Sequence, residues 1–205
     1  MIQLMKQFIL LVLFSVSLLG CKDTRPKDGK FHIVTTTSMI TDLVQNIGGE
    51  KVAVQGLMGA GVDPHLYKAS EGDVSKLSNA NMIIYSGLHL EGKLVEVFEK
   101  MKRQKIKTIA VSDALDKKEL IGSTLFASNY DPHIWFDVKN WEQITIYVEK
   151  QLSEALPEHK EYFKANAAIY LEKLKVLKQE IEAEIATLPE DKRRLVTAHD
   201  AFNYF

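Results

Sequence analysis

Short apolar runs alternate with amphipathic stretches from residue 31 onward. The apolar runs lie at residues 31–35, 52–58, 82–85 and 108–111, and each is typical of a buried strand. Between them, residues 39–47, 70–80 and 90–102 repeat apolar side chains every three or four positions, as amphipathic helices do. Ser70 and Asp73 have the spacing of a capping box at a helix start. Strands that alternate with helices predict an α/β fold with a parallel sheet and helices on its faces.

Two consecutive helices are predicted next. One apolar stripe runs from Val138 to Leu156, and Pro157 then suits the start of a second helix. Its apolar residues recur from Phe163 until Pro189 stops the pattern. Thirty residues of helix would measure about 45 Å, more than one small lobe needs. We interpret the second helix as a rigid connection between two lobes; the alternative is a coiled-coil segment that forms a dimer.

The last residues predict the beginning of another lobe. Residues 194–198 look like a strand, and residues 199–202 like the turn into a helix. These elements are too few to form a lobe, so we expect the sequence to be a fragment, or a C-terminally truncated form, of a longer protein. The expected division is an N-terminal α/β lobe at 31–156, a connecting long helix at 157–189, and the start of a truncated C-terminal α/β lobe at 190–205.

The N-terminal residues have the pattern of a secretion signal. Lys6 precedes an apolar run from Phe8 to Leu19, which is shorter than the roughly 20 residues that span a bilayer. The run ends in Leu-Leu-Gly before Cys21, which resembles a bacterial lipobox and implies lipid attachment to Cys21 after removal of residues 1–20. Residues 21–30 then form a polar tether. We expect an extracytoplasmic lipoprotein anchored to a membrane, on the periplasmic side or the cell surface; a buried N-terminal helix is the alternative.

Composition excludes several classes of function. The 26 Lys and Arg residues against 27 Asp and Glu residues give a net charge of -1, so we expect no nucleic-acid partner bound through bulk charge. An apolar share of 46% is ordinary for a globular protein. Cys21 is the single cysteine, which excludes an internal disulfide and a cluster of thiolate metal ligands.

Histidine carries the candidate chemistry. The sequence Asp-Pro-His occurs twice, ending at His65 and at His133, each time before an aliphatic and an aromatic residue. Because proline fixes its own φ and restricts the residue before it, each histidine lies on a stiff loop. Imidazole binds metals through one nitrogen while the other N–H donates to a carboxylate or carbonyl, and Asp63, Asp131 and Asp200 lie within two residues of His65, His133 and His199.

The predicted sheet brings two of these histidines to one edge. Ligands bind at the carboxyl ends of strands in open α/β sheets; His65 follows the second predicted strand and His199 follows the strand expected at 194–198. His133 lies in a loop that no assigned strand precedes. We expect three metal ligands, His65, His133 and His199, although a single Asp-Pro-His can equally be a turn that bonds locally.

The other histidines serve as controls. His32 lies in a predicted strand and His159 in the first turn of the long helix, where we expect surface or local hydrogen-bonding roles. His89 follows the third predicted strand and is an open case, because it could face the same cleft.

Four stretches together resemble a known family. They are G-L-M-G-A-G-V-D-P-H-L-Y (56–67), Y-S-G-L-H-L-E (85–91), D-P-H-I-W-F-D (131–137) and V-T-A-H-D-A-F-N-Y-F (196–205). In this order, they resemble the zinc/manganese solute-binding lipoproteins of bacterial ABC transporters. The resemblance implies two α/β lobes joined by one rigid helix, a metal ion in the cleft between them, and His65, His133 and His199 as its ligands. It also implies a fourth, acidic ligand in the second lobe beyond Phe205.

Two other functions compete with a metal carrier. Three histidines and an open position also describe a zinc-dependent hydrolase, but the sequence has no H-E-x-x-H motif, nucleophile elbow or phosphate loop. A surface adhesin lipoprotein is the second rival. We expect a monomeric carrier and no enzyme, with Zn²⁺ or Mn²⁺ as the transported ion, Fe²⁺ as a further option, and membrane permease subunits as partners.

Overall fold

A computed structural model of the chain describes residues 28–205. The expected signal peptide, Cys21 and most of the tether lie outside the described residues. Within residues 28–205, no helix has the length and apolarity that crossing a membrane requires.

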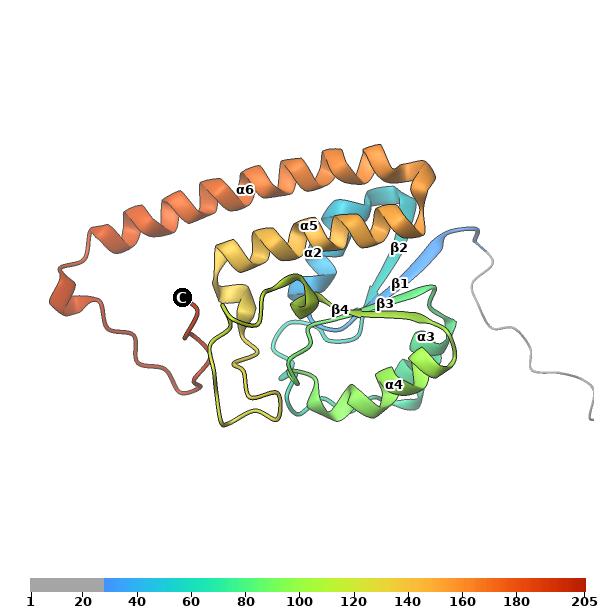
Figure 1. The fold of residues 1–205 in the computed structure, drawn as a ribbon, viewed down its shortest axis with the longest axis horizontal. Coiled ribbons are helices and arrows are strands. Elements are labelled where there is room, and N and C mark those ends of the chain that lie inside the picture. The colour runs from blue at the N-terminus through green and yellow to red at the C-terminus, as the bar shows by residue number, and fades with distance from the viewer. Residues whose placement is uncertain (1–27) are drawn as a thin grey trace, which may run out of the picture.

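A parallel sheet forms the centre of the fold. Its four strands are β1 (Phe31–Thr35), β2 (Val52–Gly56), β3 (Met82–Tyr85) and β4 (Lys107–Ala110), arranged in the order β2-β1-β3-β4 (Figure 1). Phe31 pairs with Val52 at one end of the sheet and Tyr85 pairs with Ala110 at the other. Because all four strands are parallel, their carboxyl ends meet at one edge, as the alternating sequence pattern predicts.

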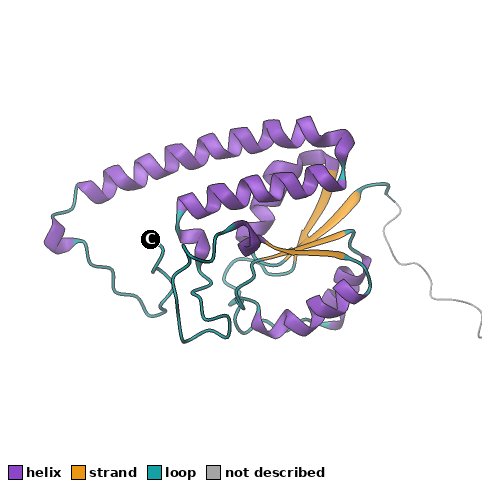
Figure 2. Cartoon of the chain, in the orientation of Figure 1, coloured by secondary structure: helices purple, strands orange, loops and turns teal. Residues whose placement is uncertain are grey.

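Helices cover both faces of this sheet (Figure 2). They are α2 (Ser38–Gly48), α3 (Glu71–Asn79), α4 (Val95–Arg103), α5 (Val138–Ala155) and α6 (Lys160–Ala186). Consecutive strand residues point to opposite faces, so Ile33 packs in the core under α2, α5 and α6, and Val34 packs in the core with α3 and α4. The predicted α/β class with a doubly covered parallel sheet is therefore confirmed.

The start of α3 has the capping box that its sequence predicts. The Ser70 hydroxyl accepts a hydrogen bond from the backbone N–H of Asp73 at 3.2 Å, and Asp73 Oδ2 accepts one from the backbone N–H of Ser70 at 3.0 Å. Tyr67 also donates to Asp73 Oδ2 at 2.8 Å. Burial opposes ionisation of Asp73, but the bonds from Ser70, Tyr67 and Lys76 outweigh it and lower the pKa of this carboxyl. Burial, together with the hydrogen bond to Asp73, raises the pKa of Tyr67 to about 12.

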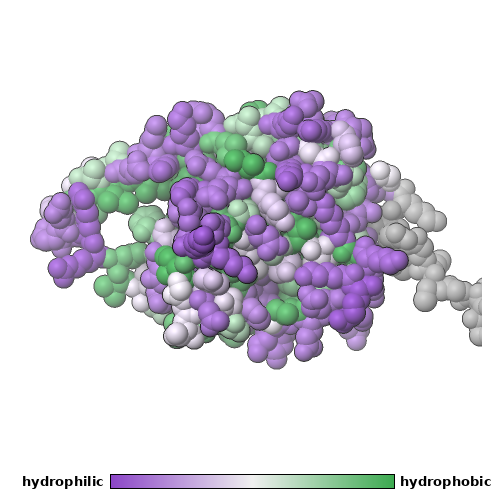
Figure 3. All heavy atoms as spheres, viewed as in Figure 1, coloured by the Kyte–Doolittle hydropathy of each residue, from purple (hydrophilic) through white to green (hydrophobic). Residues whose placement is uncertain are grey.

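The long helix α6 packs on the lobe through its first half. Phe163, Ala167 and Leu174 are buried there, and Asn166 donates to the carbonyl oxygen of Ile47 at 3.0 Å. After Leu174 the helix continues beyond the body of the lobe, and most of its residues are exposed (Figure 1). Figure 3 shows hydrophobic residues at this end of the molecule, where Leu177, Leu188, Leu195 and Val196 are exposed.

Two predicted elements differ from the structure. The helix expected at 90–102 begins at Val95, because Leu88 and His89 take positive φ and a 3-10 turn at Gly92–Leu94 precedes the helix. The strand expected at 194–198 is wrong: these residues are irregular, and Val196 is 93% exposed. A strand needs a neighbour that supplies ladder hydrogen bonds, and the described part of the chain places no strand beside this segment.

Candidate metal centre

Three histidines from distant parts of the chain converge. His133 Nε2 lies 3.2 Å from His65 Nε2 and 3.1 Å from His199 Nε2, and one nitrogen of each histidine lies within 4.8 Å of the others. Nitrogens bound tetrahedrally to zinc at about 2.0–2.1 Å would lie roughly 3.3 Å from each other. The spacing of these imidazoles therefore fits a shared metal ion.

The repeated Asp-Pro-His sequences form the same local turn. Asp63 Oδ1 accepts a hydrogen bond from the backbone N–H of His65 at 2.8 Å, and Asp131 Oδ1 accepts the equivalent bond from His133 at 2.9 Å. Each aspartate thus closes the loop over its proline in the same way, which accounts for the aspartate in both copies of the motif.

Asp131 contacts the imidazole ring of its histidine as well as the backbone. Its Oδ1 also lies 2.7 Å from His133 Nδ1, in a contact where both side chains are almost fully buried. This contact assigns the proton to Nδ1 and leaves the Nε2 lone pair of His133 facing the other two histidines. Asp200, the third aspartate that the sequence singled out, instead accepts from Asn203 at 3.1 Å.

Burial sets the protonation of the site. Desolvation lowers the pKa of His65, and it lowers the pKa of His133 despite the opposing effect of Asp131. Burial would raise the pKa of Asp131, but hydrogen bonds from Asn203 and from the backbone of His133 outweigh it and lower that pKa. Neutral imidazoles beside an ionised carboxylate are the forms that bind and support a transition-metal ion.

The histidines line a cavity of about 560 Å³ at the carboxyl edge of the sheet. Its walls come from the loops after β1 and β2, from the segment before α5, and from the segment that carries His199; they are Thr37–Met39, Met58, Gly59, Gly61–His65, His133, Trp135, Phe136, His199, Ala201 and Phe202. This is the edge where the sequence placed His65. Although the strand expected before His199 is absent, His199 reaches the same cavity.

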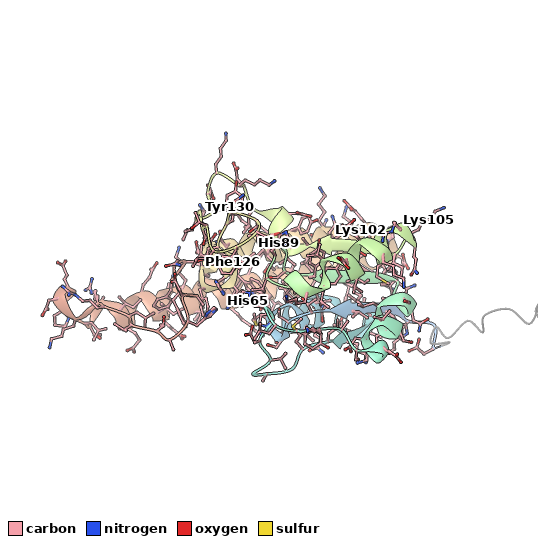
Figure 4. The ribbon with its side chains drawn as sticks, turned by 90° about the horizontal axis from the view of Figure 1, so that it is seen from below. His65, His89, Lys102, Lys105, Phe126 and Tyr130 are labelled. Atoms are coloured by element: carbon pink, nitrogen blue, oxygen red, sulfur yellow. The ribbon has the colours of Figure 1, made fainter. Side chains whose placement is uncertain are left out.

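Aromatic rings surround the imidazoles. Phe126 stacks on His65 with ring centroids 5.6 Å apart and lies edge-on to His133 at 5.7 Å. Trp135 lies edge-on to His133 at 5.3 Å. Figure 4 shows His65 and Phe126 at the end of the lobe opposite Lys102 and Lys105. Sequence reasoning missed Phe126, because it lies in an irregular loop without a motif.

A buried carboxyl group joins two loops behind the site. Glu91 Oε1 accepts from the Thr36 hydroxyl at 2.6 Å and from the Ser86 backbone N–H at 2.7 Å. It thereby links the chain after β1 to the chain after β3, where the strand order reverses. Burial raises the pKa of Glu91, and its hydrogen bonds oppose the shift.

The remaining histidines lie apart from the three. His89, which the sequence left open, is exposed and is not among the three histidines that lie together. His32 Nε2 contacts Asp28 Oδ1 at 2.7 Å, and His159 packs edge-on against Phe163. Both contacts are local, as expected from the sequence.

Fold and site together define an α/β protein with a candidate metal centre at the carboxyl edge of a parallel sheet. The chain belongs to the family described as zinc-uptake complex component A, periplasmic (ZnuA), whose model matches residues 33–205. The resemblance that the four motifs indicate is therefore confirmed.

Curated relatives cover nearly the whole chain. It is 46% identical over 198 residues to the manganese-binding lipoprotein MntA of Bacillus subtilis, covering 95% of this chain and 64% of MntA. It is 43% identical over 186 residues to the zinc-binding protein TroA of Treponema pallidum, covering 91% of this chain and 59% of TroA. The chain thus spans about three fifths of the length of these relatives.

The fold matches solved structures of similar proteins. The structure of TroA from Treponema pallidum matches with a TM-score of 0.82 at 43% identity, over 86% of this chain and 63% of that one. A manganese-bound periplasmic metal-binding protein from Candidatus Liberibacter asiaticus matches with a TM-score of 0.76 at 30% identity, over 85% of this chain and 64% of that one.

Proposed function

We propose that the protein is the extracytoplasmic metal-binding component of an ABC transporter. It captures Zn²⁺ or Mn²⁺, with Fe²⁺ as a further candidate, through His65, His133 and His199, and delivers the ion to a membrane permease. The observation that carries the proposal is the convergence of three Nε2 atoms in one cavity, with 3.2 Å and 3.1 Å separating His133 from its neighbours. Membership of the family supports the same conclusion.

Capture needs no covalent step. The ion exchanges water for the Nε2 atoms, while Asp131 holds the Nδ1 proton of His133 and Phe126 screens His65. The relatives' greater length is in keeping with a fourth, acidic ligand from a second lobe, which the family resemblance implies. Delivery then requires a permease that binds the loaded form better than the empty form.

Names of relatives leave the choice of ion open and favour binding over catalysis. MntA is named for manganese and TroA for zinc, and both names describe binding proteins. Imidazole and carboxylate suit both ions, although zinc generally binds such ligands more tightly. We therefore propose a carrier that is not an enzyme, with Zn²⁺ and Mn²⁺ as the ions to compare.

The proposal extends to the organisation of the whole protein. A lobe at 31–156, a connecting helix at 157–189 and the start of a second lobe at 190–205 would place the cavity between two lobes. A lipid on Cys21 would anchor a monomer outside the cytoplasm, and the lipoproteins among the relatives support this location.

Elemental analysis tests the proposal directly. The protein, purified without added metal, is expected to carry about one equivalent of zinc or manganese, and competition between the two ions ranks them. His65→Ala or His133→Ala is expected to abolish most of the bound metal, because each removes one of three ligands. His159→Ala, which alters a histidine packed on Phe163, is the matched control and should bind as the original does. Equal metal content in all four proteins would refute ligation by these histidines.

A further inference from the structure

The segment that carries His199 has no regular secondary structure. Residues 193–205 form neither helix nor strand, so no backbone ladder holds them in place. His199 nevertheless lies 3.1 Å from His133. Contacts between this segment and the lobe must therefore supply the precision that a helix or strand would otherwise give.

Two side chains make polar contacts that meet at one residue of the lobe. Asn203 Nδ2 donates to Asp131 Oδ2 at 2.9 Å and to Asp200 Oδ1 at 3.1 Å. The Tyr204 hydroxyl donates to the carbonyl oxygen of Asp131 at 3.3 Å and accepts from the backbone N–H of Ile121 at 3.0 Å. We call these two residues the Asn203–Tyr204 latch.

Apolar contacts seat the same segment. Ala201 is buried, and the ring of Phe202 packs on that of Phe136 with centroids 4.3 Å apart. Apolar contacts of this kind hold a segment against a surface and restrict its orientation less than hydrogen bonds do. The hydrogen bonds of the latch therefore set the orientation of the segment.

Asp131 connects the latch to the metal centre. Its Oδ1 contacts both the backbone N–H and Nδ1 of His133, and its Oδ2 is held by Asn203. A carboxylate held at both oxygens cannot rotate about its Cβ–Cγ bond without losing a partner. Its orientation in turn sets the direction of the His133 ring.

We propose that Asn203, assisted by Tyr204, is a positioning residue for the metal centre. It acts through Asp131 on His133 and simultaneously ties down the segment that carries His199. Two of the three imidazoles are thus set relative to each other by one amide. The inference rests on the proposed function, because the relative position of the histidines matters for capture only if they bind the ion.

A double-mutant cycle measures whether Asn203 acts through Asp131. Zn²⁺ affinity, measured by competition with a chromogenic chelator, is expected to fall about tenfold in Asn203→Ala, because Asp131, the partner of the proposed ligand His133, is then held less firmly. The Asp131→Ala variant should bind more weakly still, and the double variant should match Asp131→Ala, because the amide then has no carboxylate to orient. Asn46→Ala, which alters an exposed asparagine bonded within α2, is the matched control and should leave the affinity unchanged.

Imidazole ¹⁵N NMR of the metal-free protein provides a readout that does not depend on capture. The original protein is expected to show His133 protonated at Nδ1, and Asn203→Ala should shift that signal toward a mixture of tautomers. If the original protein binds none of zinc, manganese and iron, the proposed function fails and the His133 signal alone decides the positioning role. If it binds zinc and Asn203→Ala changes neither affinity nor tautomer, the latch is refuted. Additive losses in the cycle would also refute it, because they would mean that Asn203 acts independently of Asp131.

Discussion

At the scale of single residues, the two Asp-Pro-His loops hold their histidines by different means. Asp131 fixes both the backbone and the ring of His133, whereas Asp63 bonds to the backbone of His65 and the ring stacks on Phe126. His133 is therefore oriented by a charge-assisted hydrogen bond and His65 by an aromatic face. The buried, carboxylate-supported His133 is the centre of the group, because both other Nε2 atoms face it.

The protonation of these imidazoles predicts how binding depends on pH. Burial lowers the pKa of His65 and His133, so both stay neutral below the ordinary value of about 6.5. At His65 and His133, protons therefore compete with the metal only below that value, and Zn²⁺ affinity should fall most steeply between about pH 6.5 and about pH 5. The metal-free fold should lose stability over the same acidic range, because the unfolded chain takes up these protons at higher pH than the folded chain does. Competition titrations across this range check the first expectation; constant affinity would contradict histidine ligation.

The Phe126 ring is expected to shield His65 from water. Removing its ring in Phe126→Ala should cost about 1 kcal/mol of metal binding, roughly a fivefold loss of affinity, because His65 loses its stacking partner and gains access to water. Stopped-flow release of Zn²⁺ to a chelator should accelerate by a similar factor. Leu125→Ala, whose side chain is 76% exposed next to Phe126, is the control. Equal release rates in the two variants would show that the ring does not screen the site.

The residues of the site differ in how readily they can be selected from the sequence alone. His65 and His133 repeat one local motif, and family resemblance adds His199, so these three can be selected without a structure. Phe126 cannot be, because its loop carries no motif. Asn203 and Tyr204 lie inside a family stretch, but nothing local to them indicates their contacts with Asp131, more than seventy positions earlier. Glu91 lies inside a family stretch, but nothing local to it indicates the bonds to Thr36 and Ser86.

At the scale of elements, the start of α3 allows a prediction about stability. Ser70→Ala removes the hydroxyl that accepts from the Asp73 backbone, and the expected cost is about 1 kcal/mol of the free energy of unfolding. Ser75→Ala changes an exposed serine inside the same helix and should be neutral or slightly stabilising, because alanine favours helix interiors. Urea unfolding of both variants checks this. A loss no greater for Ser70→Ala than for Ser75→Ala would mean that the capping box does not stabilise the lobe.

Elements were predictable where local and tertiary preferences agree. The strands β1 to β4 and the helices α2, α3, α5 and α6 follow from apolar spacing, because each buries the side that the spacing marks. The helix expected at 90–102 begins later than predicted. The buried Glu91 carboxyl accepts a hydrogen bond from the Ser86 backbone, which bends the loop after β3 at the positions where the helix was expected to start. The strand expected at 194–198 failed for another reason: apolar alternation indicates strand propensity, but a strand also needs a neighbour.

At the scale of the whole molecule, two attachments hold the segment that carries His199. One is α6, which packs on the lobe through Phe163, Ala167 and Leu174 and then carries the chain away from it. The other is the Asn203–Tyr204 latch, which brings the chain back. The sequence predicted the helix from its periodicity and His199 as a ligand, but not the contacts that hold the returning segment, because they join Asp131 to residues more than seventy positions later.

The exposed half of α6 allows these two attachments to be separated. Glu180→Pro should break the helix beyond Leu174, because proline removes a backbone hydrogen bond and clashes with the preceding turn, at a local cost of about 3 kcal/mol. The lobe should keep its thermal midpoint, since the buried residues of α6 all precede position 180. Circular dichroism should show less helix than in the control Glu180→Ala.

Metal binding by the same pair of variants measures how much each attachment contributes to the position of His199. With α6 broken, the latch alone must order the residues between the break and His199. The conformational entropy that these residues lose when the metal binds should lower Zn²⁺ affinity about tenfold, or about 1.4 kcal/mol. Combining Glu180→Pro with Asn203→Ala should then lower affinity by more than either change alone, because both attachments are lost. Equal affinity in Glu180→Pro and Glu180→Ala would instead mean that the latch places His199 unaided, and that the long helix contributes nothing to the geometry of the three histidines.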